Sequence, residues 1–342
     1  MANLLDIRRR IRSVTSTRQI TKAMKMISAA RLRRAQERAL AARPYSHMLT
    51  NVLKSLVSRA QVIDPDTGEP RHPLLARRPE KTALLALITG DRGLAGAFNT
   101  NILKAATRFL ESKQDIRVEI VCVGRKGRDF LRRRFPYTAD RPDARVSISG
   151  ELVGQAGKFE YSDAEELAQR LIERYTRGEV DAVYFLYNEF KSVIAQRVVL
   201  DEVLPIEEIG TRDIRAAEEM TPEQRERMAE AATAAGISLA EADTTEMQRR
   251  AREFAAAPVD YLYEQPAEEL FRSLLPKYIA VQIFHALIES GAAEHAARMT
   301  AMDSATNNAS DMIDSLTLAM NRARQAKITK EIIEIVSGAA AL

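Results

Sequence analysis

A seven-residue repeat of apolar and small side chains runs through residues 292–337. Two interleaved rows of positions carry it: Met302, Ala309, Leu316 and Ala323, and Met299, Thr306, Ile313 and Met320. The steps along the chain alternate between three and four residues, which is the spacing of a coiled-coil seam. The stretch contains neither Gly nor Pro and lies between Gly291 and Gly338. At a rise of ~1.5 Å per residue, it predicts a helix roughly 70 Å long.

A second helix is predicted at the opposite end of the chain, where residues 1–43 also lack Gly and Pro. Its apolar stripe consists of Ile7, Ile11, Val14, Thr17, Ile20, Met24 and Ile27. The helical period continues beyond Pro44, which we expect to kink the helix without ending it. Each helix alone could pack on a globular core, but two such lengths at opposite termini favour a long antiparallel coiled coil.

The central part of the chain alternates between strand and helix patterns. Apolar runs predict strands at residues 81–91, 116–124, 180–190 and 196–205, and helices are expected at 95–111, 126–134 and 162–176. Ser162 and Glu165 have the spacing of a capping box at the start of the last helix. Together these elements predict a small Rossmann-like α/β domain with a parallel sheet.

Composition and pattern divide the chain into four parts. We expect an N-terminal coiled-coil helix at 1–60, the α/β domain at 80–206, a helical insertion at 207–256 and a C-terminal helical run at 257–342. Residues 62–73 form a turn-rich connection. The insertion is rich in Ala, Glu and Arg, and we expect two short helices in it, broken at Gly236. Pro266 opens the last helical run, which Pro276 could kink.

The net charge of +4 conceals a strongly basic first helix, in which only Asp6 and Glu37 oppose the cations. The basic residues are Arg8, Arg9, Arg10, Arg12, Arg18, Lys22, Lys25, Arg31, Arg33, Arg34, Arg38 and Arg43. This excess predicts an acidic partner surface. No apolar run approaches the ~20 residues that cross a bilayer. The single cysteine, Cys122, lies in a predicted strand and cannot form an internal disulfide.

Candidate chemistry is sparse. The sequence GDRGLAG at residues 90–96 follows a strand and precedes a helix, but it matches neither dinucleotide nor P-loop fingerprints, which favours a tight turn. Residues 124–127 form a second, basic glycine turn. The four histidines have no ligand spacing, and no catalytic grouping stands out. We therefore expect no metal, no cofactor and no catalytic residue.

Several blocks of sequence match a known family in the correct order. They are residues 20–24 (ITKAM), Asp91–Leu94 with Gly96 and Asn99, 260–264 (DYLYE), Glu294 with 298–302 (RMTAM), and 328–331 (ITKE) with Glu334 and 338–341 (GAAA). On these blocks the chain resembles the gamma subunits of F-type proton-translocating ATP synthases over nearly its whole length. The insertion at 207–256 is longer than in typical bacterial members.

The resemblance implies a non-catalytic central rotary shaft. Its coiled coil would turn inside a hexamer ring of alpha and beta subunits, and its α/β domain would lie on the c-ring beside the epsilon subunit. It would be peripheral, at the cytoplasmic face of the bacterial plasma membrane, and would couple proton flow to ATP synthesis or hydrolysis. By motif position, the resemblance assigns contacts with the beta subunit to Lys22, Met24, Lys25, Arg324, Gln325 and Thr329.

Two other functions remain open at this stage. A basic coiled coil could bind nucleic acid, in which case its affinity would fall steeply with salt concentration. Residues 90–96 could alternatively serve a nucleotide-dependent enzyme, which calorimetry with ATP or NAD would detect. For the insertion, we hypothesise a regulatory or stabilising contact with the ring, which deletion of residues 209–255 would test.

The predicted seam yields a direct test. Leu316→Asp places a carboxylate in the seam, so we expect the two helices to separate and the motor to uncouple. The measurement is ATP synthesis by the assembled complex. Normal assembly and synthesis would show that the assigned register is wrong.

Overall fold

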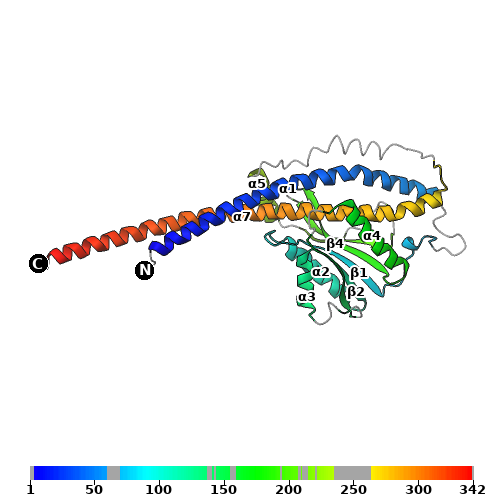
Figure 1. The fold of residues 1–342 in the computed structure, drawn as a ribbon, viewed down its shortest axis with the longest axis horizontal. Coiled ribbons are helices and arrows are strands. Elements are labelled where there is room, and N and C mark those ends of the chain that lie inside the picture. Colours follow the sequence, from blue (N-terminus) through cyan, green and yellow to red (C-terminus); the bar gives the residue numbers. More distant parts are fainter. Residues whose placement is uncertain are drawn as a thin grey trace.

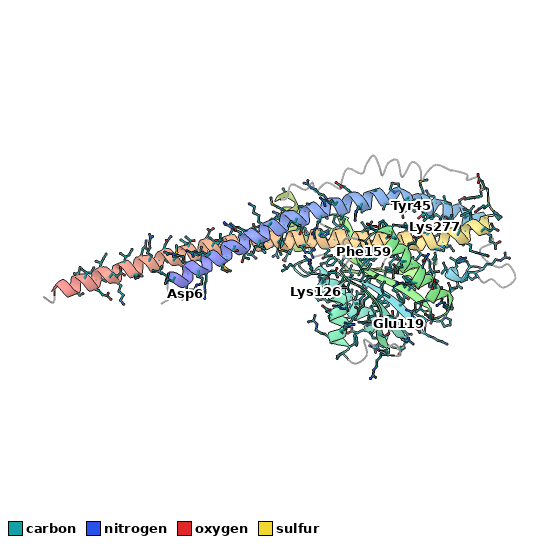
Figure 2. All side chains as sticks on the ribbon, in the orientation of Figure 1. Asp6, Tyr45, Glu119, Lys126, Phe159 and Lys277 are labelled. Carbon is teal, nitrogen blue, oxygen red and sulfur yellow. The ribbon has the colours of Figure 1, made fainter. Side chains whose placement is uncertain are left out.

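The computed structural model describes residues 4–59, 70–136, 141, 144–154, 159–192, 195–206, 209, 215–219, 222–234 and 263–340. Helices α1 (Leu4–Arg59) and α7 (Ala267–Ala340) lie side by side and antiparallel in one long rod, as Figure 1 shows. A sheet with its own helices packs against one half of this rod and forms a head. Side chains project around the rod along its length (Figure 2). The predicted fold class, a long coiled coil with an α/β domain, is therefore confirmed.

Both long helices run on through their prolines. α1 continues through Pro44, and α7 contains Pro276, Gly291 and Gly338. The last helical run begins directly after Pro266, as predicted, because α7 starts at Ala267. Each proline removes one backbone donor, but apolar side chains on both sides hold the helices in place. Leu49 and Leu53 follow Pro44, and Leu275 precedes Pro276 in the same buried cluster.

The head contains a six-stranded sheet in the order β3-β2-β1-β4-β5-β6. Its strands are β1 (Thr82–Ile88), β2 (Arg117–Val123), β3 (Val146–Leu152), β4 (Ala182–Ser192), β5 (Ala195–Leu204) and β6 (Arg215–Glu219). The first four strands are parallel, whereas β5 and β6 add antiparallel strands at one edge. β1 and β2 are buried almost throughout, which explains their continuous apolar sequences.

Two strands were not predicted. β3 is an edge strand whose sequence, VSISGEL, alternates between covered and exposed positions and has no apolar run. β6 falls within the insertion that was expected to be helical, and it extends the sheet beside β5. Helix α5 (Pro222–Ala234) follows β6 and agrees with the first of the two short helices expected in the insertion. The expected turns at 62–69, the break at Gly236 and most of the proposed deletion lie outside the described residues.

Shorter helices cover the sheet. α2 (Phe98–Ser112) and α3 (Arg125–Arg134) pack on one face, while α4 (Tyr161–Thr176) and the rod cover the other (Figure 1). A single 3-10 turn, η1 (Pro73–Leu75), precedes β1. The capping box of α4 lies two residues earlier than predicted: Asp163 accepts a 2.8 Å hydrogen bond from the Glu160 backbone N–H.

Part of the predicted stripe on α1 faces solvent. Ile7 is buried and Ile11, Val14 and Met24 are half-buried, but Thr17 is exposed, and Ile20 and Ile27 are 57% and 53% exposed. Beyond Val14, the side of α1 that faces α7 instead carries Arg18, Thr21, Lys25, Ser28 and Leu32. These positions keep the three- and four-residue steps. The prediction followed the more apolar positions, whereas the structure buries more polar ones.

Among the described residues, no helix combines the length and the apolar character needed to cross a membrane.

A third buried cluster joins rod, head and α5. Leu32 is fully buried in it, with Met299 and Ala296 from α7 and Met228 from α5. Small alanines from both long helices line this region, so the helices approach closely and leave little space for rearrangement.

We predict that Leu32→Ala lowers the free energy of unfolding by about 2–5 kcal/mol, because it leaves a cavity among these side chains. The matched control is Leu318→Ala, since Leu318 is 59% exposed, and its effect should stay within about 0.5 kcal/mol. Denaturant titration of both variants measures the difference. Equal effects would mean that the cluster does not hold the rod together.

Candidate functional site

The seam of the rod has a polar layer near its middle. Thr306 Oγ1 donates a 2.8 Å hydrogen bond to Thr21 Oγ1, and Lys25 Nζ forms an ion pair with Asp303. The side chains of Lys25 and Asp303 are only 13% and 14% exposed. Both contacts link residues nearly the whole chain apart in sequence, so they define how α1 and α7 are aligned.

Figure 1 shows α7 extending beyond the end of α1. The two polar contacts bring Leu4, the first residue of α1, level with about Ala323 of α7. From there to Ala340, about 24 Å, no described residue of α1 runs beside α7. This stretch of α7 carries five apolar side chains that are between 47% and 71% exposed: Ile328, Ile332, Ile333, Ile335 and Val336. We call this segment, residues 324–340, the tip.

The burial of the predicted seam residues varies along the rod. Met299, Met302 and Ala309 are buried between the helices or against the head. Thr306, between Met302 and Ala309, is half-buried. The members nearer the tip are all half-buried, namely Ile313, Leu316, Met320 and Ala323. Burial of these seam residues therefore declines toward the N-terminal end of α1, because fewer neighbouring elements surround the seam there.

The residues assigned to beta contacts fall into three groups. Arg324, Gln325 and Thr329 are exposed on the tip. On α1, Lys22 is exposed and Met24 is half-buried beside the seam. Lys25 instead points into the rod and pairs with Asp303, which leaves little of its side chain for another subunit.

The glycine loop at residues 90–96 joins the head to the rod. A Cβ atom on Gly90 would lie 2.9 Å from Oε1 of Glu294 in α7, so a larger residue there would require the end of the Glu294 side chain to shift. Ala95 and Phe98 are buried with Ala292, Ala296 and Met299 of α7. Glu294 is itself buried and forms an ion pair with Arg298. The favoured interpretation of this loop, a tight turn, therefore fits its position in close contact with the shaft.

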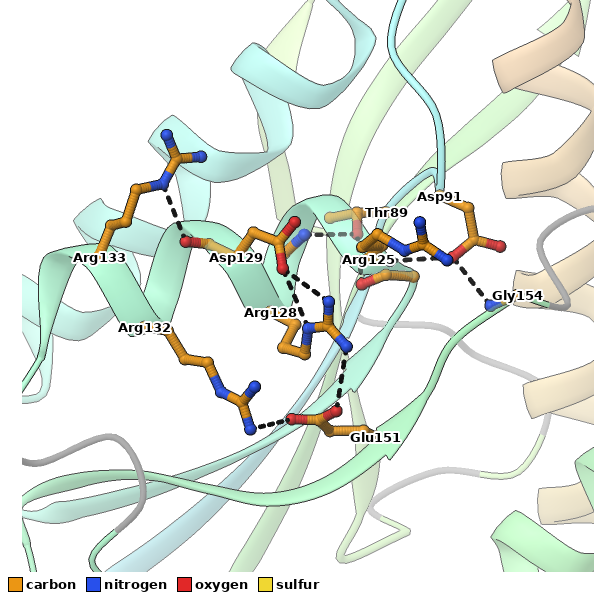
Figure 3. A network of polar contacts seen from close by, with 11 residues as sticks. Thr89, Asp91, Arg125, Arg128, Asp129, Arg132, Arg133, Glu151 and Gly154 are labelled. Atoms are coloured by element: carbon orange, nitrogen blue, oxygen red, sulfur yellow. Dashed lines mark hydrogen bonds and ion pairs between the residues drawn. The ribbon is translucent and has the colours of Figure 1, made fainter.

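The start of α3 is already occupied by side chains of the head, as Figure 3 shows. Asp91 Oδ1 accepts 3.0 Å hydrogen bonds from the backbone N–H groups of Arg125 and Gly154. Thr89 Oγ1 accepts from Gly127 N–H at 2.9 Å. A helix N-terminus favours anions, and here the carboxylate of Asp91 takes that place.

The rest of this network pairs two arginines of the basic helix α3 with carboxylates. Arg128 pairs with both Asp129 and Glu151, and Arg132 also reaches Glu151 (Figure 3). The hydrogen bond from Arg128 lowers the pKa of Asp129, so this carboxyl group remains ionised. These contacts hold α3 against β3. The glycine turns at residues 90–96 and 124–127 therefore have a structural role in the head.

Two buried ionisable groups have strongly shifted pKa values. Burial raises the pKa of the Cys122 thiol to about 12, which makes it a poor nucleophile. Burial, with the nearby charges of Arg298 and Arg31, lowers the pKa of His295 to about 4. His295 lies beside Glu294 where the rod meets the head, and its buried Nδ1 has no hydrogen-bond partner among the described residues.

No group of three or more His, Cys, Asp or Glu side chains that could hold a metal ion occurs in the part of the chain that the structure describes.

Sequence reasoning missed three parts of this arrangement. Asp303 and Thr21 carried no signal because they are polar residues at positions where an apolar stripe was sought. Glu294 was noted only as part of a motif, although a charged residue inside a long apolar repeat could have marked a buried ion pair. Asp91 caps α3 by accepting a hydrogen bond from the backbone N–H of Arg125, which lies 34 residues away in the sequence, so no local pattern indicated this role.

The fold and site define a class of protein: a shaft of two antiparallel helices with a projecting apolar tip, carried by an α/β head. The family model for ATP synthase matches residues 3–342. An ATP synthase gamma chain from Solibacter usitatus is 48% identical over 341 residues, covering all of this chain and 99% of that one. One from Anaeromyxobacter sp. is 45% identical over 344 residues, covering both chains completely.

The chain belongs to the ATP synthase gamma chain family, as its resemblance predicted. A structure of the central stalk and c-ring of the Tetrahymena thermophila mitochondrial ATP synthase contains a similar chain. That chain is 22% identical with a TM-score of 0.49, and the match covers 84% of this chain and 99% of that one. None of these comparisons supports the nucleic-acid-binding alternative.

We predict that His295 makes stability depend on pH. Its pKa of about 4 in the folded state lies below the ordinary value of 6.5, so the unfolded chain binds more protons between these values. Stability contributed by neutral His295 is therefore complete above pH 6.5 and lost as the pH falls to 4, by ~3 kcal/mol at most.

His295→Gln removes this titration. Unfolding midpoints measured between about pH 7.5 and 4.5, a range that spans most of the titration, should fall less steeply in the variant than in the unchanged protein. Parallel slopes in the two proteins would contradict a buried, neutral His295.

Proposed function

We propose that this chain is the central shaft of an ATP synthase and transmits rotation between the c-ring and the catalytic ring. The observation that carries the proposal is the rod itself: a paired shaft whose projecting tip exposes five apolar side chains far from the head. Exposed apolar side chains in such a row suit a surrounding protein surface. Membership of the gamma chain family supports the same role.

The tip would contact the ring of alpha and beta subunits from inside. Arg324, Gln325 and Thr329 lie on the tip, and Lys22 and Met24 lie on α1 where the rod is paired. We assign contacts with the beta subunit to these five residues. The basic face of α1 would meet acidic segments of the ring, where electrostatic complementarity orients the shaft more than it tightens binding.

The head would receive torque from the c-ring and the epsilon subunit. The loop at residues 90–96 is packed directly on α7 beside Glu294, so a rotation of the head must carry the rod with it. This protein would contribute no catalytic group, and the ring would bind the nucleotide. The assembled protein would lie peripherally at the cytoplasmic face of the bacterial plasma membrane.

The tip provides the test. Ile332→Ser, Ile335→Ser and Val336→Ser are combined in one chain, which is assembled with the alpha, beta and remaining subunits of the same organism in vesicles. Because the apolar bearing surface is lost, we expect ATP-driven proton pumping to fall several-fold while the head and rod stay folded.

Met48→Ser is the matched control, since Met48 is an exposed apolar residue, 59% accessible, at the opposite end of α1. Its complex should pump normally. If the triple variant pumps as well as this control, the tip is not a bearing. If the unchanged chain does not assemble with the ring, as judged by subunit mass analysis, the proposed function itself fails.

A further inference from the structure

The part of α1 beyond the head has two competing faces. One contains Ile20, Met24 and Ile27, which are more apolar and would be expected to pack on α7. The other contains Thr21, Lys25 and Ser28, and this more polar face lies in the seam, while Ile20 and Ile27 point outward. Within residues 20–28 the hydrophobic effect favours the opposite choice, although Val14 and Leu32 on the flanking turns lie on the seam side.

A rotation of about 100° around the axis of α1 would exchange these faces. Neighbouring residues of an α-helix differ by about 100° around its axis, so each outward residue has a seam residue directly beside it in sequence. Ile20 precedes Thr21, and Ile27 precedes Ser28. The side of α7 that faces α1 could pack against either face of α1, because Met302 is flexible and Ala309 is small.

We propose that Lys25–Asp303 and Thr21–Thr306 select the face of α1 that enters the seam, and thereby present Ile20, Met26 and Ile27 to the surroundings. The Asp303 side chain is largely covered on α7 and has one strong partner across the seam, Lys25. Rotating α1 would remove that partner and leave Asp303 unpaired, which is strongly unfavourable. One turn along, Thr306 would lose its contact with Thr21, but its hydroxyl keeps the Met302 carbonyl at 2.7 Å, so the ion pair carries most of the selection.

This selection matters because it positions an interaction surface. The outward residues are large and apolar: Ile20, Met26 and Ile27 are 57%, 65% and 53% exposed. Exposed Lys22 and neighbouring basic residues surround them. The surface therefore fits a partner with apolar side chains rimmed by carboxylates. Lys25 and Asp303 act on this surface as positioning residues, and the functional part of the inference rests on the proposed shaft role.

Cysteine accessibility tests the proposal without any partner. In a Cys122→Ala background, Ile27→Cys and Ser28→Cys are made separately, and maleimide labelling rates are measured on the folded full-length chain. We expect the thiol introduced at position 27 to react much faster than the one introduced at position 28. Asp303→Leu should reverse this order by several-fold in each rate, and Asp303→Asn, which keeps an acceptor for Lys25, should give a smaller shift.

Exchanging the two charges distinguishes an effect on the orientation of α1 from a general loss of stability. Lys25→Glu with Asp303→Lys rebuilds the pair in reverse, so it should restore fast labelling at position 27 and slow labelling at position 28. The matched control is Glu166→Lys with Arg170→Glu, an exposed ion pair on α4, which should leave both rates unchanged. Unaltered rates in Asp303→Leu and Asp303→Asn, or no restoration by the exchange, would overturn the proposal.

A second readout uses the assembled complex. Asp303→Leu should lose most ATP-driven proton pumping, and the exchanged pair should recover it. Reversed labelling with normal pumping would leave face selection standing but overturn its functional importance. Failure of the unchanged chain to support pumping would count against the shaft role, and labelling would still decide the selection of the face.

Discussion

Close packing of the two chain ends against each other is the constraint on which the whole structure depends. The seam is built largely from alanine, methionine and threonine, so the helices approach closely and the rod stays thin. Such side chains stabilise each contact only modestly and specify alignment poorly. The molecule compensates at two places: the polar layer of Lys25 and Asp303, and the cluster around Leu32 where head and rod meet.

Within the described residues, the head is attached to the rod through a packed surface. Gly90, after the carboxyl end of β1, lies close to the Glu294 side chain, and Ala95 and Phe98 fill the space beside Met299. At Gly124, φ is +99°, and a Cβ would lie 2.0 Å from the carbonyl oxygen of Thr89. These turns resemble parts of a phosphate site in sequence, yet their polar groups bind one another.

Most of the architecture was predictable from the sequence, because local pattern alone identifies its main elements. The seven-residue repeat of α7 is compatible only with a long helix, and the apolar runs of β1, β2 and β4 are typical of buried strands. Prediction from the sequence failed for elements whose structure depends on contacts with other strands or helices. β3 is recognisable only beside β2, and the antiparallel β5 and β6 share their strand patterns with parallel ones. Ile20 and Ile27 were misassigned because apolar character was taken as burial, whereas an ion pair across the seam determines the orientation.

The tip has a thermodynamic consequence that concerns the free protein. Isolated helices of this length are marginal in water, and those at a chain end lose their last hydrogen bonds first. The ion pairs that support it, Lys327–Glu331 at 3.6 Å and Lys330–Glu334 at 3.5 Å, have lysine on the N-terminal side, which is the weaker orientation. Because no other described helix packs against the tip, we expect its last turns to fray in the free protein and to become ordered when other subunits enclose them.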